Sequence, residues 1–250
     1  MTDGVDLPTS RDFEDLTRLS KAHRAHSLCL PFVWIALYGM FAVWNWWPIA
    51  VACLVCLSFV TYGSISHDLV HGNLGLSKRT NSFMLSVIEL LALRSGHAYQ
   101  AAHLHHHTRY PREDDIEGAA ARMSFGRTIL EGVIFQPRIW WWAAHHARRG
   151  RKLILAEGIG CVVLLLASVL LAKWTPVFLV YCVLMILGSW IIPLVTSYVP
   201  HAPDENGELR QTRLFRGKIA SLVAVNTCTT WSIIFIHRFP IIIGLGWQNG

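Results

Sequence analysis

The sequence predicts an all-α membrane protein made of two transmembrane helical hairpins, with interfacial helices and a cytoplasmic histidine-rich cap. The 250-residue chain is 53% hydrophobic and only 15% charged, whereas soluble globular proteins have about 25% charged residues. Four apolar stretches approach the roughly 20 residues that a membrane-spanning helix needs. The Lys and Arg residues lie almost entirely on one side of these stretches. This composition excludes a disordered chain, a coiled coil and a disulfide-rich secreted module.

The four apolar stretches form two hairpins because the connections within each pair are very short. The first two stretches follow each other almost directly, and Lys173-Trp174-Thr175 alone separates the last two. Such connections favour helices that cross the membrane and return. A fifth apolar run, Phe83–Leu93, is too short to span and contains Glu89, which predicts an interfacial or re-entrant helix. The predicted spans are Leu28–Trp44, Trp47–Ile65, Leu153–Ala172 and Pro176–Val195.

The distribution of positive charge predicts the orientation, because Lys and Arg are enriched in cytoplasmic loops. Of the 22 Lys and Arg residues, only Lys173 lies in a hairpin connection. We therefore expect a multi-pass integral membrane protein whose N-terminal segment 1–26, central segment 97–152 and post-195 segment are cytoplasmic. Both termini are thus expected on the cytoplasmic side. The whole of 1–250 is expected to form a single membrane-embedded domain.

The central segment alternates basic and aromatic residues, a pattern that also occurs in proteins that bind nucleic acid. It contains Ile139-Trp140-Trp141-Trp142 with several Arg residues nearby. On a membrane-bound chain, Trp beside Arg is more typical of an interfacial belt in which the cations reach the head groups. We therefore expect the membrane as a partner and no nucleic acid.

Histidines at metal-ligand spacing follow the second predicted span and recur about 30 residues later. In His67-Asp68-Leu69-Val70-His71, the two imidazoles lie on one helix face, at i and i+4, so both can reach one metal ion. In His103-Leu104-His105-His106-His107, the first, fourth and fifth residues share a face, whereas His105 points away. Both groups lie on the predicted cytoplasmic side.

The number of these histidines favours more than one metal ion. Imidazole suits zinc, copper, iron and nickel, so histidine alone does not identify the metal. Five histidines in two groups exceed the four ligands that a structural zinc usually takes. Five histidines outside these two groups are expected to be surface or interfacial residues, namely His23, His26, His97, His145 and His146.

The pattern H-D-x-x-H at the end of a second span, followed by H-x-x-H-H, resembles the histidine boxes of the membrane fatty acid desaturase superfamily. That superfamily also includes acyl hydroxylases, carotenoid hydroxylases and carotenoid ketolases. The run Tyr110-Pro111-Arg112-Glu113-Asp114-Asp115 is similar to the family's usual continuation after the second box. The resemblance covers about residues 28–220.

The resemblance implies a non-haem di-iron centre, with two iron ions held mostly by histidines and O2 as co-substrate. It implies oxidation of an acyl chain or a carotenoid from the bilayer, with electrons from a ferredoxin or a cytochrome b5-type carrier. The basic face would accept acidic head groups or an acidic electron donor. Asp68 and Asp114 are expected to accept hydrogen bonds from the ring N–H groups of ligand histidines and so to hold these rings in place. The implied metal ligands are His67, His71, His103, His106, His107 and, from its placement after the fourth span, His201.

The chain departs from the family near its C-terminal end. Family members have a third box, H-x-x-H-H, usually followed by Tyr-Pro, whereas this chain has only His237 after residue 220. Permissible codons for residues 228–240, read one base earlier, give His-His-Leu-Glu-His-His-Leu-Tyr-Pro-Ser-Val-Pro. We therefore expect residues 221–250 to be a frame-shifted tail and the chain as written to be impaired. The alternative is a genuine divergent tail, whose apolar run Ile233–Ile243 would contact the membrane.

Fatty acid desaturation is the leading functional hypothesis, and two others stay open. A carotenoid hydroxylase or ketolase would share the boxes and the compact size. A non-catalytic, metal-binding membrane remnant would keep the histidines without the reaction. A metal transporter is disfavoured, because transporters place ionisable groups deep within the spans, and Glu157 is the only acid within the four predicted spans.

Overall fold

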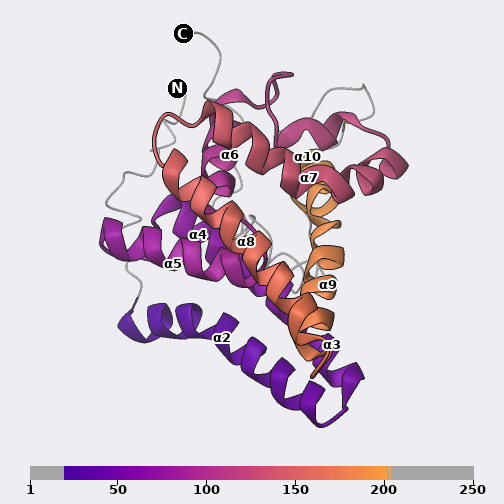
Figure 1. Cartoon of the computed structure of the whole chain (residues 1–250). Coiled ribbons are helices and arrows are strands. Elements are labelled where there is room, and N and C mark those ends of the chain that lie inside the picture. Colours follow the sequence, from indigo (N-terminus) through magenta and orange to yellow (C-terminus); the bar gives the residue numbers. More distant parts are fainter. Residues whose placement is uncertain (1–19, 202, 204–250) are drawn as a thin grey trace, which may run out of the picture.

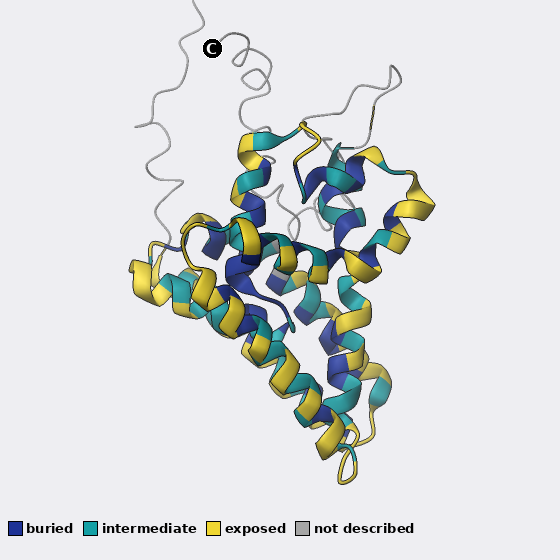
Figure 2. Ribbon diagram, turned by 45° about the horizontal axis from the view of Figure 1, so that its top comes forward, coloured by how far each residue is buried: buried dark blue, intermediate teal, exposed yellow. Residues whose placement is uncertain are grey.

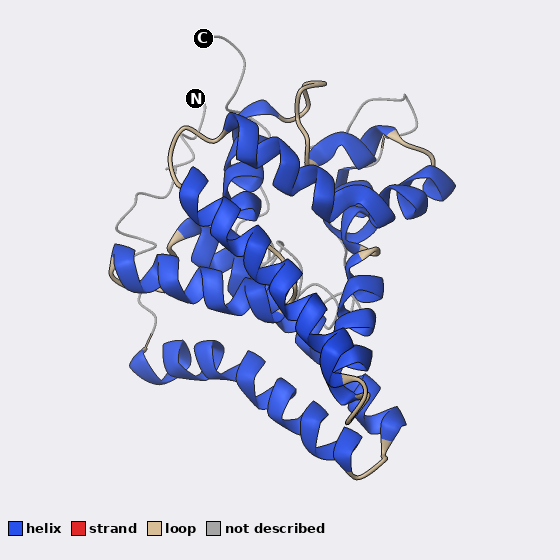
Figure 3. Ribbon diagram, viewed as in Figure 1, coloured by secondary structure: helices blue, strands red, loops and turns tan. Residues whose placement is uncertain are grey.

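The structure is a computed structural model that describes residues 20–201 and residue 203. Residues 20–201 are mostly helical and contain no β-strand (Figure 1, Figure 3). The all-α prediction is thus confirmed for this range, and the predicted tail 221–250 lies outside it. The helices are α2 (Lys21–Val43), α3 (Trp47–Val60), η2 (Thr61–Ile65), α4 (Ser66–His71), α5 (Lys78–Leu91), α6 (Gly96–Arg109), η3 (Gly118–Arg122), α7 (Phe125–His146), α8 (Arg151–Leu171), α9 (Val177–Ser189), η4 (Leu194–Tyr198) and α10 (Val199–His201).

Three helical runs in the described chain are long and apolar enough to cross a membrane, namely Lys21–Val43, Arg151–Leu171 and Val177–His201. They match the first, third and fourth predicted spans. The second predicted span contains α3, which has only 14 residues. Its backbone stays helical through the π-helix η2 and into α4. A fourth span and the sidedness of the termini therefore remain predictions.

Helix α2 begins earlier than the apolar stretch that predicts it. Ser20 caps it, because the Ser20 hydroxyl accepts a hydrogen bond from the backbone N–H of His23 at 3.1 Å. Ser is a preferred residue at this position because its oxygen satisfies an amide that has no partner within the helix. The helix consequently extends back into the segment 1–26 that the sequence assigns to the cytoplasmic N-terminal region.

The two hairpin connections lie at the same end of the molecule, at the bottom of Figure 1. Helices α6, α7 and α10 lie at the opposite end, so the long helices join the hairpin turns to the histidine-rich region. Figure 2 shows that exposed positions recur along the long helices. On α8 they include Ile159, Leu166 and Leu170, which are 65%, 60% and 68% exposed. Apolar faces of this extent are typical of surfaces that meet lipid or another protein.

Buried side chains form two cores. One lies among the helices that carry the histidines and includes Leu69 of α4, Leu85 of α5 and Phe135 of α7. The other joins α2, α3 and α9, and it includes Tyr38 and Leu57. The first core therefore fixes the relative positions of α4 and α6, which is what positions the candidate site.

Candidate metal centre

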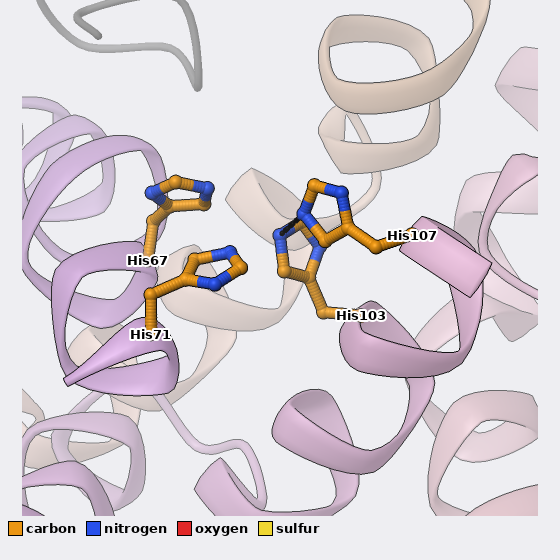
Figure 4. Close-up of side chains that lie close together, drawn as sticks. All are labelled: His67, His71, His103 and His107. Atoms are coloured by element: carbon orange, nitrogen blue, oxygen red, sulfur yellow. Dashed lines mark hydrogen bonds between the residues drawn. The ribbon is translucent and has the colours of Figure 1, made fainter. Parts of the chain in front are cut away.

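Four of the predicted histidines come together from two helices. His67 and His71 project from α4 toward His103 and His107 of α6 (Figure 4). One nitrogen of each ring lies within 4.8 Å of the corresponding nitrogen of every other ring. Nε2 of His103 and Nε2 of His107 are 3.1 Å apart. Four converging imidazole nitrogens form a donor set that suits a transition-metal ion.

The local fold brings the two pairs face to face. Helix α4 follows the π-helix η2 directly and buries Leu69, which lies roughly opposite the face that carries its histidines at i and i+4. Two amides tie the end of α4 to its neighbours: Asn81 Nδ2 of α5 donates to Leu69 O at 2.6 Å, and Gln100 Nε2 of α6 donates to Val70 O at 3.0 Å. The second bond joins the two histidine-bearing helices within one turn of their ligands.

Buried carboxylates hold two of the α6 rings. Nδ1 of His103 donates to Glu117, with distances of 3.0 and 3.1 Å to its two oxygens. Nδ1 of His106 donates to Asp115 Oδ2 at 2.7 Å. Both carboxylates are almost fully buried, since Asp115 is 0% and Glu117 is 4% exposed. Because a carboxylate only accepts, each contact places the ring proton on Nδ1 and leaves Nε2 free to bind a metal.

Gly118 allows the Asp115 carboxylate to reach His106. The backbone N–H of Gly118 donates to Asp115 Oδ1 at 3.0 Å. A Cβ atom at position 118 would lie 2.0 Å from Asp115 Oδ2 and 3.1 Å from His106 Nδ1. Any larger residue would therefore have to displace the carboxylate from the ring.

The carboxylates predicted to hold the rings have other partners in the structure. Asp68 accepts a hydrogen bond from Asn73 Nδ2 at 3.3 Å. Asp114 pairs with Arg109 at 3.6 Å, and its backbone carbonyl accepts from His105. The residues that do hold ligand rings are Asp115 and Glu117. The sequence signal was an acidic run from 113 to 117, but the turn after α6, not the spacing, decides which acids face inward.

His106 and His201 lie beside the four-histidine cluster. The His106 ring centroid is 6.1 Å from that of His103 and 5.3 Å from that of His201. The ring of Tyr110 contacts both in tilted arrangements, with its centroid 5.2 Å from that of His106 and 4.5 Å from that of His201. Like α4, the short helix α10 that carries His201 follows a π-helix. The structure thus places all six predicted ligands in one region, four of them within mutual reach of one ion.

The environment keeps most of the cluster neutral. Burial, followed by the neighbouring His103, lowers the pKa of His67 to about 3 and that of His107 to about 4. The same causes lower the pKa of His71. Burial also acts against the charged form of His106, but the hydrogen bond to Asp115 and the charge of Glu117 outweigh it and raise its pKa. Neutral imidazoles can bind a metal without first losing a proton.

The remaining histidines fall into three groups. His105 donates through Nε2 to Asp114 O, 3.2 Å away, and lies outside the cluster, as the helix periodicity predicts. His23, His26, His145 and His146 are exposed, as predicted. His97 is different: the prediction of a surface or interfacial position is wrong, because its side chain is buried and pairs with Glu157 at 2.7 Å. The pairing partner lies 60 residues away in α8, so no local pattern indicates it.

A cavity of about 430 Å³ lies between α7 and α8. Apolar side chains dominate its walls, and Ser95, the residue before α6, contributes to its lining. The lining residues are Leu93, Arg94, Ser95, Gln136, Pro137, Trp140, Gly158, Ile159, Cys161, Val162 and Val163. Its size and apolar walls suit part of a hydrocarbon chain.

Comparison with known proteins agrees with the geometry of the site. No curated protein sequence matches the chain. The sequence profile of the family described as "Fatty acid desaturase" matches residues 44–241, which is more than half of the chain and includes all six histidines. The chain belongs to the fatty acid desaturase family.

Proposed function

We propose that this chain is a membrane-bound, non-haem di-iron lipid oxidase whose reaction is the O2-dependent desaturation of an acyl chain, and that the chain as written is impaired in that reaction. The observation that carries this proposal is the convergence of four imidazole nitrogens within 4.8 Å in a member of the fatty acid desaturase family. The family supports an oxidoreductase of the desaturase and hydroxylase type. Iron as the metal, O2 as the co-substrate and an acyl chain as the substrate are proposals that go beyond what the family match supports.

The donor set fits iron. His67, His71, His103 and His107 would hold one ion. His106 and His201 offer imidazoles for a second, with their ring centroids 5.3 Å apart. Bound iron would supply the activation of O2 that oxidation of an unactivated C–H bond requires. A set of neutral nitrogen ligands from two helices suits iron, although it does not exclude zinc or copper.

The chain's own residues would prepare the site for the metal. Glu117 and Asp115 fix the rings of His103 and His106 so that Nε2 faces the ligand position. Burial keeps His67 and His107 unprotonated at neutral pH. Both effects reduce what must be reorganised when the metal binds, since second-sphere carboxylates orient the rings and raise their basicity.

An apolar substrate from the bilayer fits the surroundings of the site. Three helical runs could span a membrane, and the cavity between α7 and α8 has apolar walls. We propose a lipid acyl chain as substrate. A carotenoid, which would be hydroxylated or converted to a ketone, is the alternative that the same fold allows.

We propose that the electron donor docks on the basic side of the molecule. An exposed cationic run extends from the α7–α8 connection into the first turn of α8 and consists of Arg148, Arg149, Arg151 and Lys152. An acidic carrier such as a ferredoxin or a cytochrome b5-type protein would be attracted to it, as would anionic lipid head groups.

Lipid analysis of cells that express the chain, as written and with its reading frame restored, tests the proposal, and we expect products from the restored chain. New double bonds in acyl chains that require His103 support a desaturase, whereas oxygenated carotenoids would assign the carotenoid reaction instead. The matched control is His146→Ala, because His146 is exposed and lies outside the cluster. The frame-restored gene belongs in the same experiment. If it yields neither product while still binding metal, the chain is a non-catalytic metal-binding protein.

A further inference from the structure

A buried polar cluster lies within the apolar bundle at the start of α6, outside the histidine site. Its centre is Glu157 of α8, which is 3% exposed. Oε1 of Glu157 is 2.7 Å from Nδ1 of His97 and accepts from the Ser86 hydroxyl at 2.5 Å. The other ring nitrogen of His97 is 2.8 Å from the Ser82 hydroxyl. The cluster therefore joins α5, α6 and α8.

Two of its hydrogen bonds end on the first turn of α6. Oε2 of Glu157 accepts from the backbone N–H of His97 at 3.0 Å and from the hydroxyl of Ser95 at 2.6 Å. The Ser95 hydroxyl in turn caps α6 by accepting from the backbone N–H of Ala98 at 3.2 Å. The first amides of a helix have no partner within it and favour negative charge nearby. Glu157 supplies both an acceptor and the charge, from a different helix.

We propose that Glu157 is a positioning residue for the metal centre: it fixes the N-terminal turn of α6 and, through it, the placement of the ligand histidines that α6 carries. His97 and His103 are six residues apart on one helix, which corresponds to about 9 Å. A shift or fraying of the first turn therefore reaches the first ligand directly. This inference rests on the proposed metal-binding function of the cluster.

Stability of the bundle alone does not account for a carboxylate at this place. A buried ion pair is often no more stabilising than well-packed apolar residues, and ionisable groups in apolar spans are more typical of functional sites. In the described chain, three of the four hydrogen bonds of Glu157 go to His97 or to Ser95, which caps α6, and the fourth goes to Ser86 of α5, which lies beside His97. Most of the arrangement is therefore directed at the helix that bears the candidate ligands.

The first arm of the test is hydrogen–deuterium exchange on the metal-free, full-length protein in lipid nanodiscs. The variants are Glu157→Ala, Glu157→Gln, which retains a carbonyl acceptor, and Tyr38→Ala as the control. Tyr38 lies in the second core, which contains no residue of α6. Its truncation should therefore lower overall stability without removing any hydrogen bond of Glu157. We expect about tenfold faster exchange of the amides of residues 96–103 in Glu157→Ala, a smaller increase in Glu157→Gln, and none in Tyr38→Ala.

The second arm is titration with cobalt(II), followed by its visible absorption. We expect about tenfold weaker cobalt binding and an altered spectrum in Glu157→Ala, partial recovery in Glu157→Gln, and unchanged binding in Tyr38→Ala. The proposal is overturned if Glu157→Ala matches the unaltered chain in exchange over 96–103 or in cobalt affinity, or if Tyr38→Ala loosens α6 equally. A failure of the unaltered chain to bind cobalt would instead overturn the metal centre, and the exchange arm would still decide whether Glu157 holds α6.

Discussion

The two helices that supply the cluster hold their histidines in different ways. On α6, buried carboxylates fix the rings of His103 and His106 through Nδ1. On α4, neither His67 nor His71 makes a ring hydrogen bond to another residue of the described chain, and helix packing positions them. The α6 half is therefore oriented before a metal binds, whereas the α4 half has to be oriented by the metal itself. The pKa shifts depend on the carboxylate contact and not on the helix: burial lowers the pKa of His67 on α4 to about 3 and that of His107 on α6 to about 4, while Asp115 helps to raise that of His106.

The largest effect is expected from restoring the proposed reading frame of the tail. The restored third box would add histidines to a site that has six candidates in the described chain, and a dinuclear centre needs both ions fixed. We expect the restored chain to bind two irons and to oxidise lipid, and the 250-residue chain to be nearly inactive. Iron per chain and lipid products measure this. Equal iron content and equal rates would show that the written tail is a genuine variation.

Removing one ring from each helix tests the cluster itself. His103→Ala deletes the ring that neighbours His67, His71 and His107, and it leaves the buried Glu117 without its partner. We expect cobalt(II) affinity to fall more than about 100-fold, which is beyond the usual effect of a second-sphere change. The cobalt(II) affinity of His67→Ala should be reduced almost as much. His105→Ala is the matched control and should bind normally.

The carboxylates sharpen the comparison between the helices. Glu117→Gln and Asp115→Asn should each weaken cobalt(II) binding by about 10- to 100-fold, because the rings lose a negatively charged group that can only accept and so fixes their tautomer. Asp68→Asn on α4 should change it little, since Asp68 contacts Asn73 and no ligand ring. A strong effect of Asp68→Asn, or no effect of Glu117→Gln, would contradict the conclusion that carboxylates hold rings of α6 and not those of α4.

Gly118→Ala tests the Asp115 contact without altering either polar group. The added Cβ would collide with Asp115 Oδ2, so the carboxylate must move away from His106. We expect cobalt(II) binding to weaken by about tenfold, no more than in Asp115→Asn. In a variant that combines Gly118→Ala with Asp115→Asn, the two losses of affinity should not add, because both act through the contact between Asp115 and His106. Additive losses would place the role of Gly118 elsewhere.

The smallest effect is a pH dependence of stability that His67 of α4 and His107 of α6 produce, because neither ring contacts a carboxylate of the described chain. The pKa of His67 is lowered from 6.5 to about 3, and that of His107 to about 4. Below pH 6.5 the unfolded chain therefore binds protons that the folded chain does not, so stability is lost as the pH falls from about 6.5 toward 4. We expect the melting temperature of the metal-free protein to drop by about 5 °C over this range. His67→Gln should flatten the change, and an unchanged profile in that variant would contradict the assignment.

The spacing of the histidines predicted the ligand faces well because a helix converts sequence separation directly into direction. His67 with His71, and His103 with His107, lie as i and i+4 geometry requires. The acids that support the rings could not be predicted in the same way. Asp115 and Glu117 reach back to α6 across a turn, whose path depends on contacts such as Arg138 Nη2 donating to Ile116 O at 3.2 Å.

The role of His97 and the length of the second span escaped prediction for related reasons. His97 is buried only because Glu157, in a helix far along the chain, lies opposite it. The apolar run of the second span predicts a uniform helix, but the backbone forms a π-helix from Thr61 to Ile65, next to Ser66 and its contact with Glu89. Tertiary contacts decide both features, and π-helical segments are frequent at functional sites.

X-ray absorption at the iron edge of the purified, iron-loaded protein tests the central claim most directly. The account predicts iron with several imidazole nitrogens at about 2.0–2.2 Å, and their loss in His103→Ala but not in His146→Ala. Iron that is bound only by oxygen or sulfur ligands would contradict it. So would iron content and spectra that do not change when His103 is removed.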